Sequence, residues 1–162
     1  MPTGKNICYQ LGNSKEVYAV IVYGIGVNPY QAKSLGVSSC LEIKRMCRTE
    51  PKQKYELSRF ISITIKMVTK EHNVDAIVAF ADPEQGHEGI VYKASGFKHE
   101  GKTNPEWHLI DKDGNKRHRR LAFRYARRKN ITIEQAREEL GMKRSITLPK
   151  HRWVRYINNR RG

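Results

Sequence analysis

The chain has 162 residues, a formal net charge of +15, 38% apolar residues and 29% charged residues. This length suits one globular domain with a real core, so we expect residues 1–162 to form a single domain. No apolar run reaches the roughly 18 residues that a membrane span needs, and the N-terminus lacks the apolar segment of a secretion signal. Cys8, Cys40 and Cys47 form no close pair, which argues against a disulfide framework and predicts the reducing cytoplasm.

The positive charge is concentrated in one part of the chain. Residues 112–162 hold 17 Lys and Arg against 4 Asp and Glu, whereas residues 1–111 hold 14 against 12. Phosphate backbones and anionic membranes are the polyanions that such a surplus attracts. The last third of the chain is therefore the expected contact for a polyanion.

The first fifty residues contain one clear strand. Residues 16–25 are rich in Val, Ile and Tyr and lie between turn-forming residues, which predicts a strand buried on both faces. Residues 4–12 favour a strand weakly, and residues 26–36 predict a loop with a helical turn. The pattern of residues 37–48 assigns no element, and residues 50–54 predict a polar connection.

The segment that follows carries two competing patterns. Residues 55–61 predict a strand. Apolar residues then alternate as far as Met67, which favours a longer strand, but the same segment also has apolar residues at helical spacing. We expect a helix over residues 62–72, because its lysines then point away from the apolar side.

The centre of the chain gives the strongest local signals. Residues 75–81, DAIVAFA, predict a buried strand, and residues 82–86 predict a turn. Residues 87–95 predict a short helix with Ile90, Val91 and Ala94 on its apolar side. Gly96 suits the left-handed position that ends such a helix.

The remaining elements are strands followed by helices. Residues 97–103 and 107–111 predict strands, with a hairpin turn at Asp113-Gly114. Residues 117–129 predict a basic helix. Thr132 and Gln135 form a capping-box pattern at the start of a second helix that ends at Gly141, and residues 153–157 predict a last strand. Alternating strands and helices predict a mixed α/β sheet with helices on its faces.

The central motifs resemble a known family. ELSRF is followed by VAFADPEQGHEGIVYKASGF and by a strand that ends at Gly101. This order resembles the Mom family of phage DNA-modification proteins, which is related to the GNAT acyltransferases. The resemblance covers about residues 55–103 and extends more loosely to PKHRWVRYI near the C-terminus.

The resemblance implies a GNAT-like mixed central sheet flanked by helices. The charge distribution adds the expectation that residues 112–162 form a basic helical extension that contacts nucleic acid. The resemblance also implies an enzyme that places a carbamoylmethyl or methylcarbamoyl group on the N6 amine of adenine in double-stranded DNA and so shields phage DNA from restriction. Acetyl-CoA is the implied donor. The implied place of action is the host cytoplasm, and the sequence is compatible with a homodimer and gives no sign of a membrane partner.

Three residues are the predicted catalytic group. Asp82 follows a buried strand, where open α/β sheets bind ligands; it would act as a base or orient His87, although Asp-Pro also forms turns. His87 lies between Gly86 and Gly89 and has a pKa range suited to proton transfer, although an exposed histidine at a helix start is the alternative. In the GNAT enzymes a tyrosine at the place of Tyr92 protonates the departing thiolate; the alternative is a packing tyrosine.

Four further residues are predicted to bind substrate or cofactor. Arg59 would hold a phosphate or orient the substrate from a central strand, unless it is a surface arginine. Gly86 and Gly89 allow close approach of a ligand, and Ser95 is a weaker candidate. The GNAT glycine-rich loop, expected here at RFISITIK, is missing, so CoA binding is implied by the family alone.

The basic helix is the predicted DNA contact. Its arginines share one side of a helical wheel, and like charges crowded together destabilise a helix that has no partner. The predicted contacts are Arg117, Arg120, Arg124, Arg127, Arg128 and Arg152. The six dispersed histidines show no metal-ligand spacing, so no metal site is predicted and a metal requirement stays undecided.

Two alternatives remain open at this point. One is a non-catalytic nucleic-acid-binding protein on an acyltransferase fold, and the other is a GNAT N-acetyltransferase that acts on another amine. The basic third favours a nucleic-acid partner, whereas the group of Asp82, His87 and Tyr92 favours an enzyme.

Overall fold

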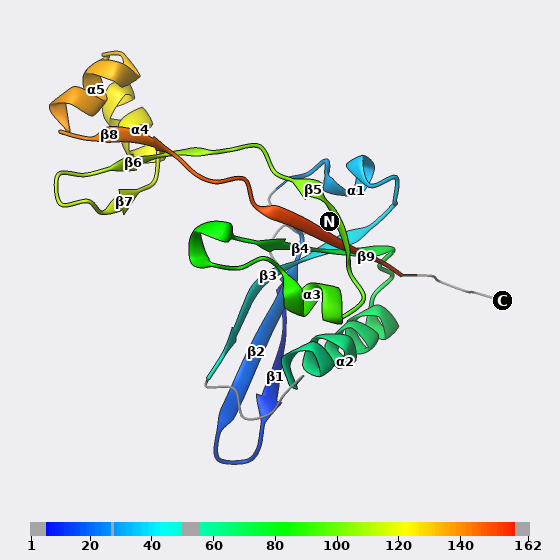
Figure 1. Cartoon of the computed structure of the whole chain (residues 1–162). Helices are drawn as coiled ribbons and strands as arrows, with labels where there is room; N and C mark the ends of the chain where they lie inside the picture. The colour runs from blue at the N-terminus through cyan, green and yellow to red at the C-terminus, as the bar shows by residue number, and fades with distance from the viewer. Residues whose placement is uncertain (1–5, 27, 50–55, 158–162) are drawn as a thin grey trace. The chain divides into compact units, whose positions relative to one another are not determined.

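The computed structural model describes residues 6–26, 28–49 and 56–157 (Figure 1). The chain divides into two compact units. The first unit comprises residues 1–81, 87–102 and 151–162, and the second comprises residues 82–86 and 103–150. The chain thus leaves the first unit twice, briefly at residues 82–86 and then for residues 103–150, and returns for its last strand.

The first unit is built on a six-stranded sheet with the order β1-β2-β3-β4-β9-β5. Its strands are β1 (Ile7–Gly12), β2 (Val17–Gly24), β3 (Cys40–Arg48), β4 (Ala76–Ala81), β5 (Lys98–Lys102) and β9 (His151–Tyr156). Its helices are α1 (Gln31–Ser34), α2 (Glu56–Glu71) and α3 (Ile90–Ala94). Only the described pair of β3 and β4 is parallel, and the other neighbouring strands are antiparallel. The expected mixed α/β sheet flanked by helices is confirmed.

Helix α2 supplies most of the side chains that cover one face of this sheet. Phe60, Ile61, Thr64, Ile65 and Val68 are buried and recur at the three- and four-residue spacing of a helical face. The four apolar residues among them join a core cluster with residues of β2, β3, β4, α3 and β9. A smaller cluster of Ala76, Val78 and Val154 packs with residues 35–40, after α1. The sheet therefore has buried side chains on both faces.

The expected strand over residues 55–61 is wrong, as is the expected helix start at residue 62. Residues 56–61 already belong to α2, and residue 55 lies outside the described range. The alternation that favoured a strand comes from Ile63 and Met67, which are 47% and 42% exposed on the outer side of the helix. The β-branched residues of ISITI thus occupy a helix because its apolar face is buried, and tertiary packing outweighs their strand preference.

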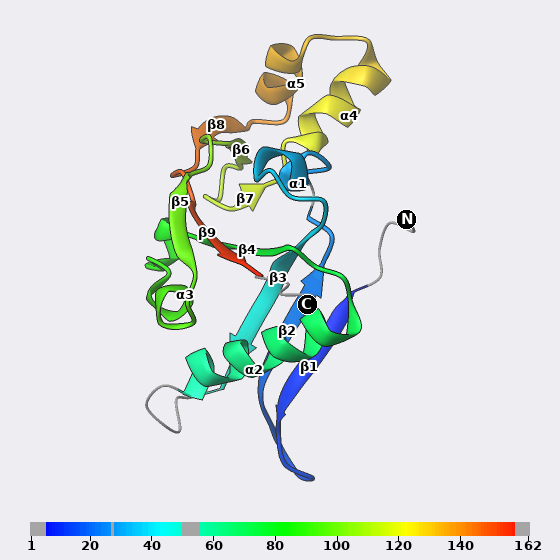
Figure 2. The same cartoon turned by 90° about the vertical axis from the view of Figure 1, so that its right-hand side faces the viewer.

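The second unit pairs a small sheet with two helices. The sheet has the order β7-β6-β8, and Figure 2 shows α4 and α5 side by side. The elements are η1 (Pro83–Gln85), β6 (Trp107–Ile110), β7 (Lys116–Arg117), α4 (Arg120–Lys129), α5 (Ile133–Glu139) and β8 (Lys143–Ile146). Leu109 and Ala136 are fully buried, as is Ala122, with Ala126 at 6% exposure. Small alanines allow the two helices to approach closely.

Several local predictions are confirmed. Residues 75–81, 97–103 and 107–111 contain strands β4, β5 and β6, and residues 153–157 overlap β9, which begins two residues earlier, at His151. Gly96 has a φ of 80° after α3. Thr132 and Gln135 form both hydrogen bonds of a capping box, with distances of 3.2 and 2.9 Å.

Other boundaries differ from the prediction. The basic helix begins at Arg120, because residues 116–117 form β7 in the hairpin. The expected apolar side of α3 is wrong, since Tyr92 is the buried side chain and Ile90 is 74% exposed. The unassigned residues 37–48 contain β3, and the connection at residues 50–54 lies outside the described residues. Within the described ranges, no helix is long and apolar enough to cross a membrane.

Candidate functional site

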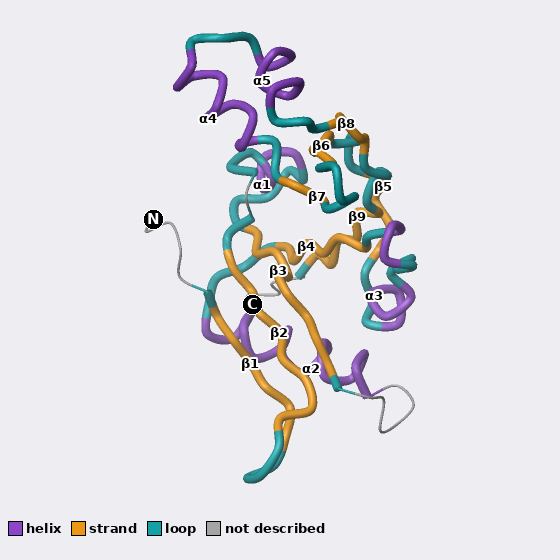
Figure 3. Tube along the Cα trace, turned by 90° about the vertical axis from the view of Figure 1, so that its left-hand side faces the viewer, coloured by secondary structure: helices purple, strands orange, loops and turns teal. Residues whose placement is uncertain are grey.

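Strands β3 and β4 separate after a short parallel contact. Their described register covers only Cys40–Glu42 against Ala76–Val78, although β3 continues to Arg48 and β4 to Ala81. Figure 3 shows the two strands leaving their common start in different directions. On the side that faces β3, the backbone of Ala79–Ala81 therefore belongs to no described strand pair. Such an edge offers backbone donors and acceptors to an extended ligand.

Tyr92 lies on the buried side of α3. Its ring packs against Phe97, with 5.5 Å between the ring centroids, and only 8% of the residue is exposed. Burial raises the pKa of its phenol, because a phenolate would lose solvation there. The hydroxyl therefore stays protonated at neutral pH and suits a proton donor better than a base.

Gly89 packs directly against the indole of Trp153. It precedes α3 with a φ of 84°, and a Cβ at this position would overlap atoms of that indole ring. Trp153 pairs with Ala79 across β4 and β9. Its buried Nε1 has no hydrogen-bond partner among the described residues. The sequence analysis missed Trp153, because nothing local to WVRYI indicates a contact with Gly89.

His87 and Ser95 lie at opposite ends of the α3 segment. His87 is exposed in the loop that precedes the helix. The hydroxyl of Ser95 is buried and donates to the carbonyl oxygens of Val91 and Ser58, at 2.8 and 3.3 Å. The carbonyl oxygen of Ser95 accepts a 2.6 Å hydrogen bond from Arg155. Ser95 thus fixes α3 in place, and its binding of a ligand stays a prediction.

Asp82 has the contacts of a turn-forming residue. One carboxylate oxygen accepts from the backbone N–H of Glu84 at 3.1 Å, which caps η1, and the other lies 3.3 Å from Nζ of Lys150. Gly86 ends this turn with a φ of 69° and with open space around its Cα. Asp82 and Gly86 belong to the second unit, whereas His87 and Tyr92 belong to the first. Their joint catalytic role stays a prediction.

Arg59 lies in α2, not on a central strand as expected, and its side chain is exposed. The segment RFISITIK is therefore helix and not the link where a glycine-rich loop would lie. The link between β3 and α2 is residues 49–55, TEPKQKY, which also contains no glycine; residues 50–55 lie outside the described ranges. The sequence between β3 and α2 therefore lacks glycine, as RFISITIK does. The expected position of the link, at RFISITIK, was wrong.

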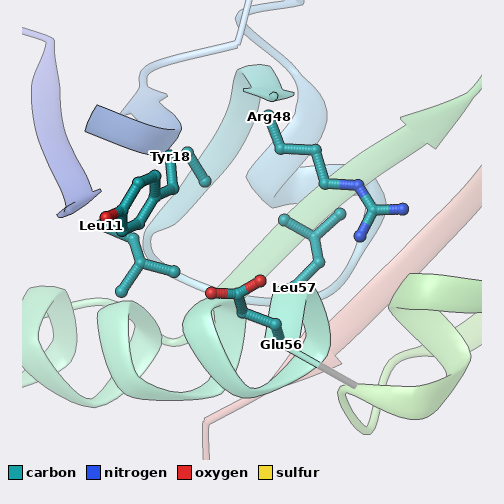
Figure 4. A pocket seen from close by; sticks show the side chains of 6 residues that line it. Leu11, Tyr18, Arg48, Glu56 and Leu57 are labelled. Carbon is teal, nitrogen blue, oxygen red and sulfur yellow. The ribbon is translucent and has the colours of Figure 1, made fainter. Parts of the chain in front are cut away.

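A shallow hollow lies at the start of α2 (Figure 4). Its volume is about 10 Å³, which is no more than a single water requires. The lining residues are Leu11, Tyr18, Ala19, Arg48, Glu56 and Leu57. The hollow is too small for a substrate, but it places the cation of Arg48, which the sequence analysis did not single out, beside the first turn of α2.

The predicted DNA-contacting arginines fall into two groups. Those on α4 are all exposed and lie opposite its buried alanines: Arg120, Arg124, Arg127 and Arg128. The other two are not on this helix. Arg117 is in β7, where its Nε donates to Asp111 at 2.9 Å, and Arg152 is in β9 of the first unit, where its Nε donates to the carbonyl oxygen of Glu100 at 3.0 Å.

Two described features bear on metal binding. Nε2 of His99 and Nδ1 of His151 lie 3.0 Å apart, which joins two possible ligands in a hydrogen bond. No group of three or more His, Cys, Asp or Glu side chains in the described part of the chain could hold a metal ion.

Comparison with known proteins identifies both a family and a fold. The Mom protein family matches residues 2–161. The methylcarbamoylase Mom of Escherichia phage Mu is 20% identical over 153 residues, which cover 91% of this chain and 62% of that protein. The chain thus spans less than two thirds of the length of this relative.

Solved structures of acetyltransferases share the fold. AAC(6')-Ib in complex with ribostamycin and coenzyme A has a TM-score of 0.53 and 11% identity, over 97% of this chain and 69% of that one. The ribosomal-protein-S5-alanine acetyltransferase of Vibrio fischeri has a TM-score of 0.50 and 13% identity, over 91% and 58%. The expected GNAT-like fold is confirmed.

Proposed function

Since this chain belongs to the Mom protein family, we propose that it is a phage-type DNA-modification enzyme. It would add an acyl-derived group, of the carbamoylmethyl or methylcarbamoyl kind, to the N6 amine of adenine in double-stranded DNA. The observation that carries this proposal is the family match over residues 2–161 of a chain with an acetyltransferase fold. The modified adenines would protect the DNA from restriction enzymes in the host cytoplasm.

Acetyl-CoA is the proposed donor. It would bind where β3 and β4 separate. The main-chain groups of Ala79–Ala81 that face β3 lie outside the described strand pairing, and would hold the extended amide-bearing arm of such a donor. Arg48, at the end of β3, and Arg59, in α2, would meet its phosphates. The N6 amine would attack the thioester carbonyl carbon, so that an N–C bond forms, the C–S bond breaks and the CoA thiolate leaves. This step by itself leaves an acetyl group on the amine, and the amide nitrogen of a carbamoylmethyl or methylcarbamoyl group would have to come from a further, nitrogen-containing reactant.

Tyr92 is the proposed general acid. Its raised pKa keeps a proton on the phenol, and Tyr92 would give that proton to the departing sulfur. His87 is exposed and would take the proton that the N6 amine loses, with Asp82 as the alternative base. A buried general acid and a solvent-linked base suit an amine that is weakly nucleophilic because its lone pair is delocalised into the ring.

The second unit would hold the DNA. Residues 116–129 contain eight Lys and Arg and no Asp or Glu. Phosphate contacts of this kind supply most of the sequence-independent affinity for duplex DNA. They would also offset the cost of bringing a base out of the stack, which is needed because the duplex hides its exocyclic amine.

The mass of the nucleosides tests the proposal. The protein is expressed in cells that carry a plasmid, and plasmid DNA is digested to nucleosides. We expect deoxyadenosine of increased mass. Tyr92→Phe keeps the ring that packs on Phe97 and removes the proton donor, so it should lower the yield by a factor on the order of 10² to 10⁴.

Tyr30→Phe is the matched control, because Tyr30 is 70% exposed and outside the proposed site; its yield should equal that of the wild type. Unmodified deoxyadenosine under all conditions, together with retained DNA binding, would instead support a non-catalytic DNA-binding protein. An acylated amine on another molecule, with unmodified DNA, would support an ordinary N-acetyltransferase.

A further inference from the structure

The second unit carries a cluster of cations and aromatic rings that the folding of α4 does not require. The ring of Trp107, on β6, lies 6.0 Å from the ring of Phe123, on α4. The guanidinium carbons of Arg119 and Arg144 lie 5.9 and 5.3 Å from the Trp107 ring. We call Trp107, Arg119, Phe123 and Arg144 the Trp107 cluster. The two cation–π contacts hold the ring of Trp107 in place, and Trp107 in turn contacts Phe123.

The apolar part of this cluster is exposed. Phe123 is 44% exposed, and Ile146, which is the cross-strand partner of Trp107, is 64% exposed. Cross-strand partners share one face of a sheet, so Ile146 extends the apolar surface around Trp107. Helix α4 buries a different side, formed by Ala122 and Ala126. The exposed ring of Phe123 therefore contributes little to the core of its own unit.

Phe123 adjoins the arginine face of α4. At about 100° per residue, it lies between the buried alanines and the side chains of Arg120 and Arg127. Among the described residues, neither of these arginines has an ion-pair partner, whereas Lys129 is bound to Glu139 at 2.9 Å. An exposed aromatic ring next to unpaired guanidinium groups fits a partner that has both anions and flat apolar surfaces.

Duplex DNA has this chemistry. Its phosphates match the arginines, and proteins insert Phe, Leu or Ile between base pairs to unstack and bend a duplex. An anionic membrane would also attract the arginines, but an interfacial helix needs a broad apolar face. Helix α4 exposes one large apolar side chain, Phe123, because the others are half-buried or alanine.

We propose that Phe123 is a wedge that inserts between base pairs of the DNA substrate, while the arginines of α4 hold the flanking phosphates. Trp107 and its two guanidinium partners support the ring from the side of β6. The wedge would unstack the target adenine and so expose its amine. This inference rests on the proposed function, which supplies duplex DNA as the partner and adenine as the target base.

The test uses the full-length protein and a duplex with 2-aminopurine, whose fluorescence rises when it leaves the base stack. Wild-type protein should raise the fluorescence at saturation. Phe123→Ala should abolish the rise and weaken binding by roughly 5- to 150-fold, the range for loss of one stacking contact. Its salt dependence should not change, because no phosphate contact is removed. Phe123→Leu should keep most of the rise.

Arg124→Gln is the matched control on the same helix. It should lower the slope of log affinity against log salt by about 0.9, yet keep the full fluorescence rise at saturation. Circular dichroism of each variant should match the wild type, since Phe123 is on the exposed side of α4.

Three results would overturn the wedge. One is a Phe123→Ala variant with wild-type affinity and fluorescence. Another is wild-type binding without any fluorescence rise, which would leave adenine modification itself untouched, because the nucleoside masses measure that independently. The last is binding to anionic phosphatidylserine vesicles that is stronger than to DNA and depends on Phe123, which would assign the ring to a membrane.

Discussion

The two units of this protein differ in what their side chains do. The first buries large residues such as Tyr23, Ile61 and Ile77 with no exposure at all. In the second, the described residues with no exposure are Leu109, Ala122 and Ala136, and the arginines of α4 are exposed. Apolar area removed from water is the main source of stability. The first unit is therefore built as a rigid scaffold, and the second as a carrier of surface charge.

The largest expected effect comes from removing the positive charge of the α4 arginines. Replacing Arg120, Arg124, Arg127 and Arg128 together by Gln should lower duplex affinity at 0.1 M salt by a factor on the order of 10³, because each phosphate contact contributes about 0.9 to the salt slope. Affinity titrations at several salt concentrations measure both quantities. The melting of the first unit should not change.

Arg117→Gln is the control for this set, because Arg117 is bound to Asp111 at 2.9 Å. It should alter the salt slope much less than any arginine of α4. A quadruple variant with the wild-type slope would contradict the assignment of α4 to phosphate.

A cavity in the core of one unit should destabilise that unit and leave the other unchanged. Ile77→Ala and Leu109→Ala each remove a large part of a fully buried side chain, and each should cost about 2–5 kcal/mol. Hydrogen exchange should show lost protection in β4 for the first variant and in β6 for the second. Equal losses throughout the chain in both variants would instead make the two units one cooperative body.

A methyl group at Gly89 tests the contact with Trp153. Gly89→Ala should cost clearly more than the roughly 1–2 kcal/mol of a left-handed non-glycine residue, because the new Cβ would overlap the indole. Gly36→Ala is the matched control, since Gly36 has a φ of 67° and no atom within 4 Å of an added Cβ. Equal shifts in the denaturant midpoints of the two variants would show that the indole moves aside without cost.

The smallest expected effect concerns pH. Burial raises the pKa of Tyr23 to about 12, from 10.0 for the ordinary phenol. Between these values the unfolded chain loses the proton that the folded chain keeps, so the free energy of unfolding falls as the pH rises. Tyr23→Phe should remove this part of the pH dependence and cost about 1 kcal/mol at neutral pH, from the 2.8 Å hydrogen bond to Thr64. Urea unfolding from pH 8 upward measures this difference. If the wild type and Tyr23→Phe lost the same amount of stability, Tyr23 would not be the source of the pH dependence.

Sequence reasoning placed some candidate residues in the correct elements and misplaced others, while the roles of all of them stay predictions. Tyr92 is in the predicted short helix, and the arginines of α4 share the predicted face. Arg59 was misplaced because the β-branched run beside it looks like a strand until α2 buries one of its faces. Arg152 was assigned to the DNA contact by charge alone, which cannot reveal that its Nε is bound to Glu100.

The sequence by itself determined the elements whose signals are local. The apolar run of β4, the capping box at Thr132 and the glycine after α3 each depend on residues a few positions apart, so hydrogen bonding and periodicity within one segment decide them.

The tertiary structure alone decided which segments meet. Strand β9 lies between β4 and β5, Trp153 covers Gly89, and β3 parts from β4 after Glu42. The register of β4 and β9 joins residues up to 80 positions apart, Ala76 with Tyr156. Such pairings depend on the combined burial of many side chains, and no single segment encodes them.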